Sequence, residues 1–145
     1  MLGVGNALRA DDGAGPAVAE LLRPRFPDRV FDGGQAPENF TGPMRRADPD
    51  TVLIVDAADF GGEAGEIRVA DADDVGGLMT GTHAPPLSMF MRLLSEDTGA
   101  NVYLLAIQVE SMELGGAMSP RVREAVEGLS SEMASLLEGG DPRVE

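Results

Sequence analysis

The chain contains no cysteine and no lysine, and its 11 basic residues are all arginine. The absence of cysteine excludes disulfides, thiolate catalysis and zinc or iron sites ligated by sulfur. The absence of lysine excludes Schiff-base chemistry and amine nucleophiles on side chains. With a single histidine, His83, the chemistry must come from carboxylates, one imidazole, hydroxyls or the backbone.

Long hydrophobic runs and an excess of basic residues are also missing. No apolar run approaches the roughly 18 residues of a membrane span, and no leader precedes the first glycines, so we expect a cytoplasmic protein without membrane insertion. The net charge of −14 argues against nucleic acid as a partner, because binding a polyanion depends on clustered Lys and Arg. A length of 145 residues predicts a single domain over residues 1–145.

Segments typical of strands alternate with segments typical of helices. Two apolar runs predict strands buried on both faces of a parallel sheet, and an alternating segment predicts an antiparallel edge strand. The strands are expected at residues 30–32, 51–56, 66–69 and 101–107, in addition to a short one before the first glycines. Helices are expected at residues 16–22, 42–47, 85–94 and 119–137, while 36–40 and 71–77 are expected to be loops.

This alternation predicts an α/β fold: a three-layer sandwich with a mostly parallel, twisted central sheet of about five strands, flanked by helices. In such sheets, ligands bind outside the carboxyl ends of the strands. Asp11, Asp12 and Asp56 stand at those ends, and His83 precedes a predicted helix. We expect these four side chains to converge on one edge of the sheet.

Carboxylates and one imidazole form an oxygen and nitrogen donor set that suits a divalent metal such as nickel, zinc, manganese or cadmium. Three ligands would leave positions open for catalysis or for a metal shared with a partner. Each residue also has a structural interpretation. Asp11 could cap the following helix, Asp56 could form a turn, and His83 could be a buried hydrogen-bonding residue.

Two other α/β functions are less compatible with the residues. The dinucleotide fingerprint requires a third glycine where Leu8 follows Gly3 and Gly5, and the phosphate loop requires a lysine. A phosphoacceptor receiver domain also normally uses a lysine. A metal- or nucleotide-binding module without enzymatic activity remains the alternative hypothesis.

Four motifs occur in order along the chain: G-V-G-N-x-L-x-x-D-D-G-x-G, D-G-G-x-A-P-E-N, L-I-V-D-A-x-D and T-H-x-x-P-L. Together they resemble the hydrogenase maturation endopeptidases, and the subgroup serving formate-hydrogenlyase-type hydrogenases (hydrogenase 3) and its archaeal relatives is the most similar. The resemblance implies a protease, of the aspartate and histidine metal-site type, that acts on the large-subunit precursor of a nickel-iron hydrogenase. It would remove a short C-terminal extension after nickel insertion.

The resemblance also implies the site. Asp12, Asp56 and His83 match the metal-binding catalytic positions of the family. The implied metal is nickel, expected to be that of the precursor, and other divalent metals can occupy such a site. Two roles remain open: the metal either marks a nickel-loaded precursor for cleavage or polarises a water for hydrolysis.

Two further expectations concern the surroundings of this site. Only Met1 and Leu2 precede Gly3, whereas family members usually have more apolar residues there, so the first strand is expected to be short. The protein is expected to be a monomer. Exposed backbone next to the second strand could pair with an extended substrate peptide, and this predicted substrate cleft comprises Gly33, Gly34, Pro37, Glu38 and Asn39.

Overall fold

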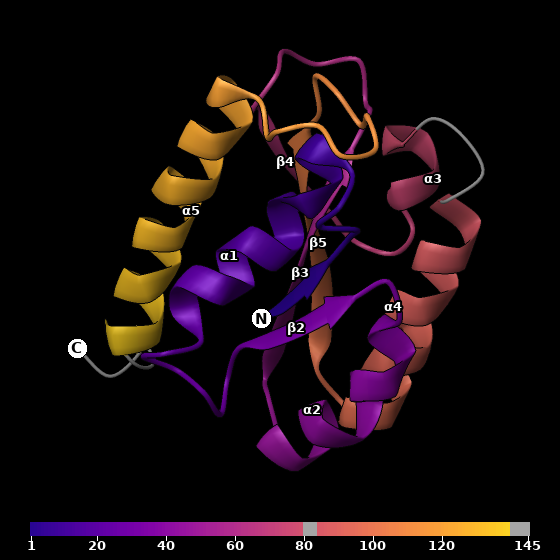
Figure 1. The fold of residues 1–145 in the computed structure, drawn as a ribbon. Helices are drawn as coiled ribbons and strands as arrows, with labels where there is room; N and C mark the ends of the chain where they lie inside the picture. The colour runs from indigo at the N-terminus through magenta and orange to yellow at the C-terminus, as the bar shows by residue number, and fades with distance from the viewer. Residues whose placement is uncertain (80–83, 140–145) are drawn as a thin grey trace.

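The computed structural model describes residues 1–79 and 84–139, and its centre is a sheet (Figure 1). Within these residues the sheet has five strands in the order β2-β1-β3-β5-β4. All neighbouring strands are parallel except β4, which runs antiparallel to β5 at one edge. The bounds are β1 Leu2–Val4, β2 Phe31–Gly34, β3 Thr51–Ala58, β4 Ile67–Ala70 and β5 Asn101–Gln108.

Helices cover both faces of this sheet, which confirms the predicted three-layer α/β fold (Figure 1). One face packs on α1 and α5, and the other packs on α2, α3 and α4. None of the helices in the described part of the chain is both long and apolar enough to cross a membrane. The helices are α1 Ala14–Leu22, α2 Thr41–Ala47, α3 Val75–Leu78, α4 Ala84–Thr98 and α5 Pro120–Gly139, with 3-10 turns η1 Ala10–Gly13 and η2 Pro37–Phe40.

The sequence of β3 explains its central place. Successive side chains of a strand point to opposite faces, and both faces of β3 carry apolar residues. Ile54 packs in the cluster beneath α4, whereas Val55 packs in the cluster beneath α1 and α5, and both are fully buried. Each such side chain contributes about 1.5–3 kcal/mol of hydrophobic stabilisation. The strand therefore joins the two cores and fixes the sheet between them.

Some of the predicted boundaries and loops are wrong. β3 continues for two residues beyond Asp56, because Ala57 and Ala58 are small, apolar and buried against opposite helical layers. The expected loop at 36–40 contains the turn η2. The expected acidic loop at 71–77 contains the start of α3, where the Asp71 carboxylate accepts hydrogen bonds from two backbone amides and Val75 is fully buried.

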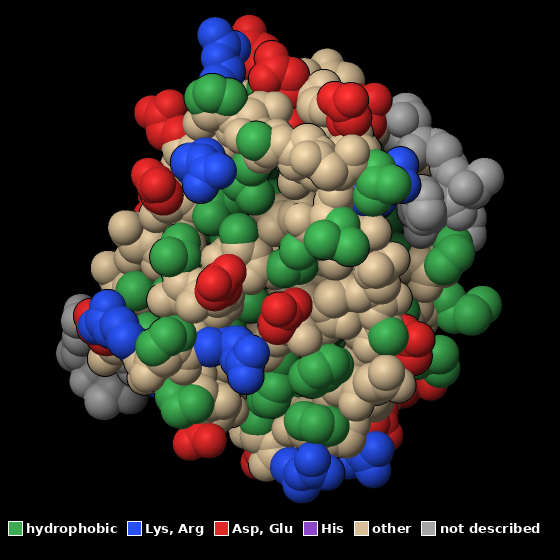
Figure 2. All heavy atoms as spheres, in the orientation of Figure 1, with side chains coloured by type: hydrophobic (Ala, Val, Ile, Leu, Met, Phe, Trp, Pro, Cys, Tyr) green, Lys and Arg blue, Asp and Glu red, His purple; other side chains and the backbone are tan. Residues whose placement is uncertain are grey.

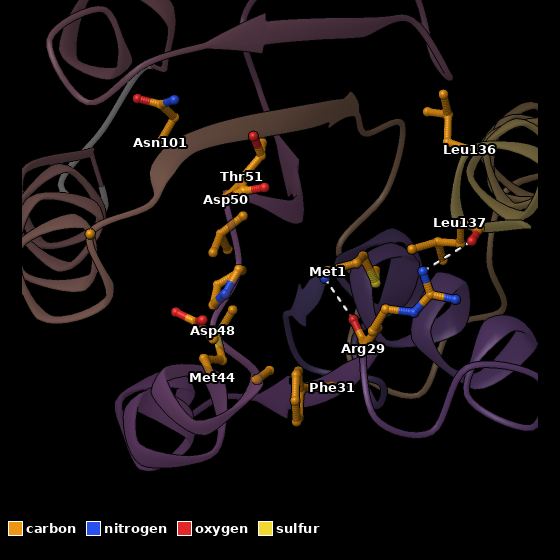
Figure 3. Close-up of a pocket in the computed structure, with 14 residues that line it drawn as sticks. Met1, Arg29, Phe31, Met44, Asp48, Asp50, Thr51, Asn101, Leu136 and Leu137 are labelled. Carbon is orange, nitrogen blue, oxygen red and sulfur yellow. Dashed lines mark hydrogen bonds between the residues drawn. The ribbon is translucent and has the colours of Figure 1, made fainter. Parts of the chain in front are cut away.

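The first strand is a short one, as the sequence predicts. β1 has three residues, and Leu2 is already aligned with Ile54, so residues 51–53 of β3 have no partner in β1. The Met1 ammonium donates a hydrogen bond to the carbonyl of Arg29 at 2.8 Å, and the Arg29 guanidinium donates one to the carbonyl of Leu137 at 3.0 Å (Figure 3). These bonds close the amino end of β1 against the start of β2 and the end of α5.

Candidate active site at the carboxyl edge of the sheet

The glycine-rich turn after β1 brings the backbone very close to its surroundings. A Cβ on Gly5 would overlap the carbonyl oxygen of Asp12, and the φ of Gly5 is +144°. A Cβ on Gly15 would overlap the carbonyl oxygens of Val4 and Val55. Glycine is required at both positions so that η1 and the start of α1 can lie directly on the sheet. These glycines therefore serve packing, which agrees with the absence of a nucleotide fingerprint.

Asp12 lies in η1, above the carboxyl ends of β1 and β3. It is partly buried, and its Oδ2 accepts a hydrogen bond from the amide of Asn6 at 3.0 Å. The second carboxylate oxygen has lone pairs that remain available to a ligand. Asn6 in turn accepts a hydrogen bond from the amide of Leu8 at 2.9 Å through its own side chain, so this turn is internally braced.

Asp56 extends from β3 toward the face covered by α4, because it lies between Ile54 and Ala58 in the strand alternation. Burial and, after it, the negative charge of Asp12 together raise the pKa of Asp56 to about 7, against the opposing effect of a hydrogen bond from the Ala57 backbone. Two carboxylates from different elements thus share one poorly hydrated space. Such a pair is costly to ionise without a cation.

Asp11 has a structural role that differs from the predicted one. It does not cap the following helix; its fully buried carboxylate instead binds the segment between β5 and α5. Its Oδ2 accepts hydrogen bonds from the amides of Glu110 and Ser111, both at 2.8 Å. Ser119 contributes two more at 2.7 Å, from its amide to Oδ1 and from its hydroxyl to Oδ2. No buried polar side-chain atom within the described chain lacks a partner.

These contacts set the charge of Asp11. Burial acts to raise the pKa of Asp11, but the hydrogen bonds from Ser111, Ser119 and Glu110 together outweigh it and hold the pKa below its ordinary value. They also secure a strained turn, since Ala10 has a left-handed φ of 48° although it is not glycine. The position of Asp12 is consequently fixed by its neighbour.

The third predicted ligand, His83, lies outside the described residues. Among residues 1–79 and 84–139, no group of three or more Asp, Glu or His side chains is arranged to hold a metal ion. The structure therefore brings together Asp12 and Asp56 and provides no test of the complete set. α4 begins at Ala84, next to His83 in the sequence.

The predicted substrate cleft lies at the carboxyl end of β2, beside the glycine-rich turn. Gly33 is buried, and the carbonyl of Gly34 already accepts a hydrogen bond from Gly5 at 2.9 Å. Pro37 is partly buried, whereas Glu38 and Asn39 are exposed on η2. The exposed residues could meet a peptide, and a substrate role for this segment remains a prediction.

Sequence reasoning missed a second supporting residue, Gln108. This buried side chain ends β5, and its Oε1 accepts hydrogen bonds from the amides of Phe60 and Gly62 at 2.9 and 3.1 Å. Its Nε2 donates to Asp59 and to the carbonyl of Val109 at 3.1 and 3.0 Å. Gln108 thereby fixes the loop that follows Asp56. The available signal was a polar residue at the end of the apolar run in β5.

A cavity of about 910 Å³ lies elsewhere, at the amino ends of the strands (Figure 3). Met1, Thr51 and Asn101, at or next to the starts of β1, β3 and β5, are among its lining residues. The predicted site lies at the opposite, carboxyl ends of the same strands. This cavity lies beside the short β1, and neither Asp12 nor Asp56 lines it.

Fold and site together define a three-layer α/β protein with an acidic site at the carboxyl edge of its sheet. A family model described as hydrogenase maturation protease matches residues 16–136. The hydrogenase 3 maturation protease of Escherichia coli K12 is 42% identical over 130 residues, which cover 88% of this chain and 83% of that relative. The chain therefore belongs to the hydrogenase maturation protease family, and it is a peptidase.

Solved structures agree with this assignment. The crystal structure of HycI, a NiFe hydrogenase maturation protease from Thermococcus kodakarensis KOD1, is similar with a TM-score of 0.85 at 35% identity, covering 94% of this chain and 90% of that one. The solution structure of the endopeptidase HycI from Escherichia coli has a TM-score of 0.77 at 36% identity, with coverages of 90% and 85%.

Proposed function

We propose that this peptidase removes the C-terminal extension from the nickel-loaded large-subunit precursor of a nickel-iron hydrogenase. Family membership supports the reaction class. The main support for the location of the active site is the pairing of Asp12 with Asp56. Burial and the neighbouring negative charge of Asp12 raise the pKa of Asp56 to about 7. Such perturbed carboxylates are concentrated at functional sites.

The donor set fits a divalent cation. A cation between the two carboxylates would remove the cost of placing like charges in a poorly hydrated space. His83 would complete a set of two oxygen donors and one nitrogen donor, which suits nickel. We propose that the nickel belongs to the precursor and that the three residues recognise it. A bound metal can also polarise a carbonyl or a water, and this direct hydrolytic role is the other form of the proposal.

The remaining parts of the proposal concern partners and location. The exposed residues Glu38 and Asn39 would border the extended peptide of the precursor, next to the end of β2. The net charge of −14 argues against a nucleic-acid partner, and on the face shown in Figure 2 arginine side chains are interspersed with acidic ones. We propose a cytoplasmic monomer.

The test is a cleavage assay with purified protein and nickel-loaded precursor, read as the mass of the precursor's C-terminus. Asp12→Asn and His83→Ala should abolish shortening, whereas Asp28→Asn, an exposed aspartate beyond α1, should cleave normally. Nickel-free precursor should remain uncut if nickel is the recognition element. Equal cleavage of both precursors would exclude recognition of nickel, and full activity of the two site variants would exclude the proposed site.

A further inference from the structure

Three exposed apolar side chains gather on two loops beside the candidate site. Leu8 belongs to the glycine-rich turn and is 69% exposed. Met112 and Leu114 belong to the segment between β5 and α5 and are 41% and 66% exposed. Single exposed apolar residues are ordinary on protein surfaces, but a group of them on adjoining loops is typical of an interaction site. We refer to Leu8, Met112 and Leu114 as the apolar ridge.

The two loops that carry the ridge are held together by hydrogen bonds. The carbonyl of Leu8 accepts a hydrogen bond from the amide of Gly115 at 2.7 Å. Three residues farther along the turn, the amide of Asp11 donates to the carbonyl of Ser111 at 3.0 Å. The buried Asp11 carboxylate adds bonds to both ends of the second loop. The ridge is thus a preorganised surface, and little conformational entropy would be lost when a partner binds to it.

The ridge is also continuous with the candidate site. The amide of Leu8 donates to the side chain of Asn6 at 2.9 Å, and the amide of Asn6 donates to Oδ2 of Asp12 at 3.0 Å. Two hydrogen bonds therefore connect the backbone of a ridge residue to the carboxylate of a proposed ligand. The ridge therefore lies within reach of a peptide held at Asp12.

We propose that the apolar ridge binds apolar side chains of the precursor next to the peptide bond that is cleaved. This inference rests on the proposed function, because the precursor is the occupant to which it commits. The other exposed apolar residues described on helices, such as Leu21 on α1 and Leu136 on α5, have no such connection to Asp12. Contact with the ridge would bury apolar surface from both partners and strengthen precursor binding, while the ridge residues would take no part in breaking the peptide bond.

The experiment compares two double variants. Leu8→Ser with Leu114→Ser removes most of the ridge, and Leu21→Ser with Leu136→Ser removes two similarly exposed leucines from the helices. Each variant is measured for the Kd of nickel-loaded precursor, for the KM and kcat of cleavage, and for sedimentation behaviour. Circular dichroism verifies folding, and Leu114→Arg provides a second ridge variant that leaves the glycine-rich turn intact.

We expect the ridge variants to raise Kd and KM roughly tenfold or more while kcat at saturation changes little, and the control variant to behave like the original protein. Unchanged Kd and KM in both ridge variants would overturn the inference but leave the proposed function intact. A ridge that changes only self-association would likewise overturn it, since the occupant would be a second copy. If the original protein binds the precursor without cutting it, the proposed function fails and the inference fails with it, because no cleaved bond then lies beside the ridge.

Discussion

Replacing Asp56 by asparagine should stabilise the metal-free protein at neutral and alkaline pH. In the folded state, burial and then the charge of Asp12 raise the pKa of Asp56 from 3.8 to about 7. A raised pKa means that the fold favours the neutral acid. The contribution of Asp56 to the stability of the fold is fully present below pH 4, declines between pH 4 and 7, and is absent once the carboxyl of the folded protein ionises. Asparagine is neutral throughout, so the variant avoids this loss.

The magnitude follows from the same pKa. A change in pKa from 3.8 to about 7 corresponds to roughly 4 kcal/mol of folding stability. Because Asp56 is only partly buried, solvent screens its charge, and the expected gain in stability of the variant falls to about 2 kcal/mol. The assay is urea unfolding of Asp56→Asn and the original protein, with a chelator present, at pH 4.5, 6 and 8. The stability difference should favour the variant more strongly as pH rises. A difference independent of pH, or a variant less stable at pH 8 than at pH 4.5 relative to the original protein, would refute the reasoning.

Two further substitutions test the support of the site. Asp11→Asn should cost about 3 kcal/mol in urea unfolding at pH 7, because an amide cannot satisfy the buried donors that the carboxylate accepts. Since the pKa of Asp11 is lowered in the fold, this cost should shrink as pH falls below 4, and a cost that stays constant to pH 2 would contradict the argument. Gly15→Ala should cost about 2–3 kcal/mol of folding stability, because the added Cβ would overlap two carbonyl oxygens. The control is Gly128→Ala on the exposed face of α5, where a Cβ meets nothing within 4 Å, and it should be neutral or slightly stabilising. Equal effects of the two substitutions would argue against close packing of α1 on the sheet.

The sequence predicts the sheet well where hydrophobic periodicity is strong. The apolar runs of β3 and β5 and the alternation of β4 are visible directly, and they place Asp56 near the carboxyl edge. The turn of α3 was missed because its acidic composition conceals one buried residue, Val75, and depends on a local turn made by the Asp71 carboxylate.

The candidate site was predictable only in part, for a related reason. Asp12 and Asp56 can be chosen from motif and strand position, and their electrostatic coupling follows once both lie at one edge. The partners of Asp11 could not be found this way, because Glu110, Ser111 and Ser119 are about a hundred residues away in sequence and no local pattern connects them. Contacts between distant loops depend on the completed topology, which periodicity does not encode.

The hydrogen bonds between Asp11 and Ser119 span 108 positions of the chain, and they constrain when the site can form. During synthesis the glycine-rich turn leaves the ribosome well before the segment that fixes it, because Ser119 follows Asp11 by 108 positions. A nascent chain can therefore build its first helix and strands before its carboxylates are held in place. The protease would acquire a defined site only after Ser119 has been made, so chains that stop before this residue would have little capacity to cut a precursor.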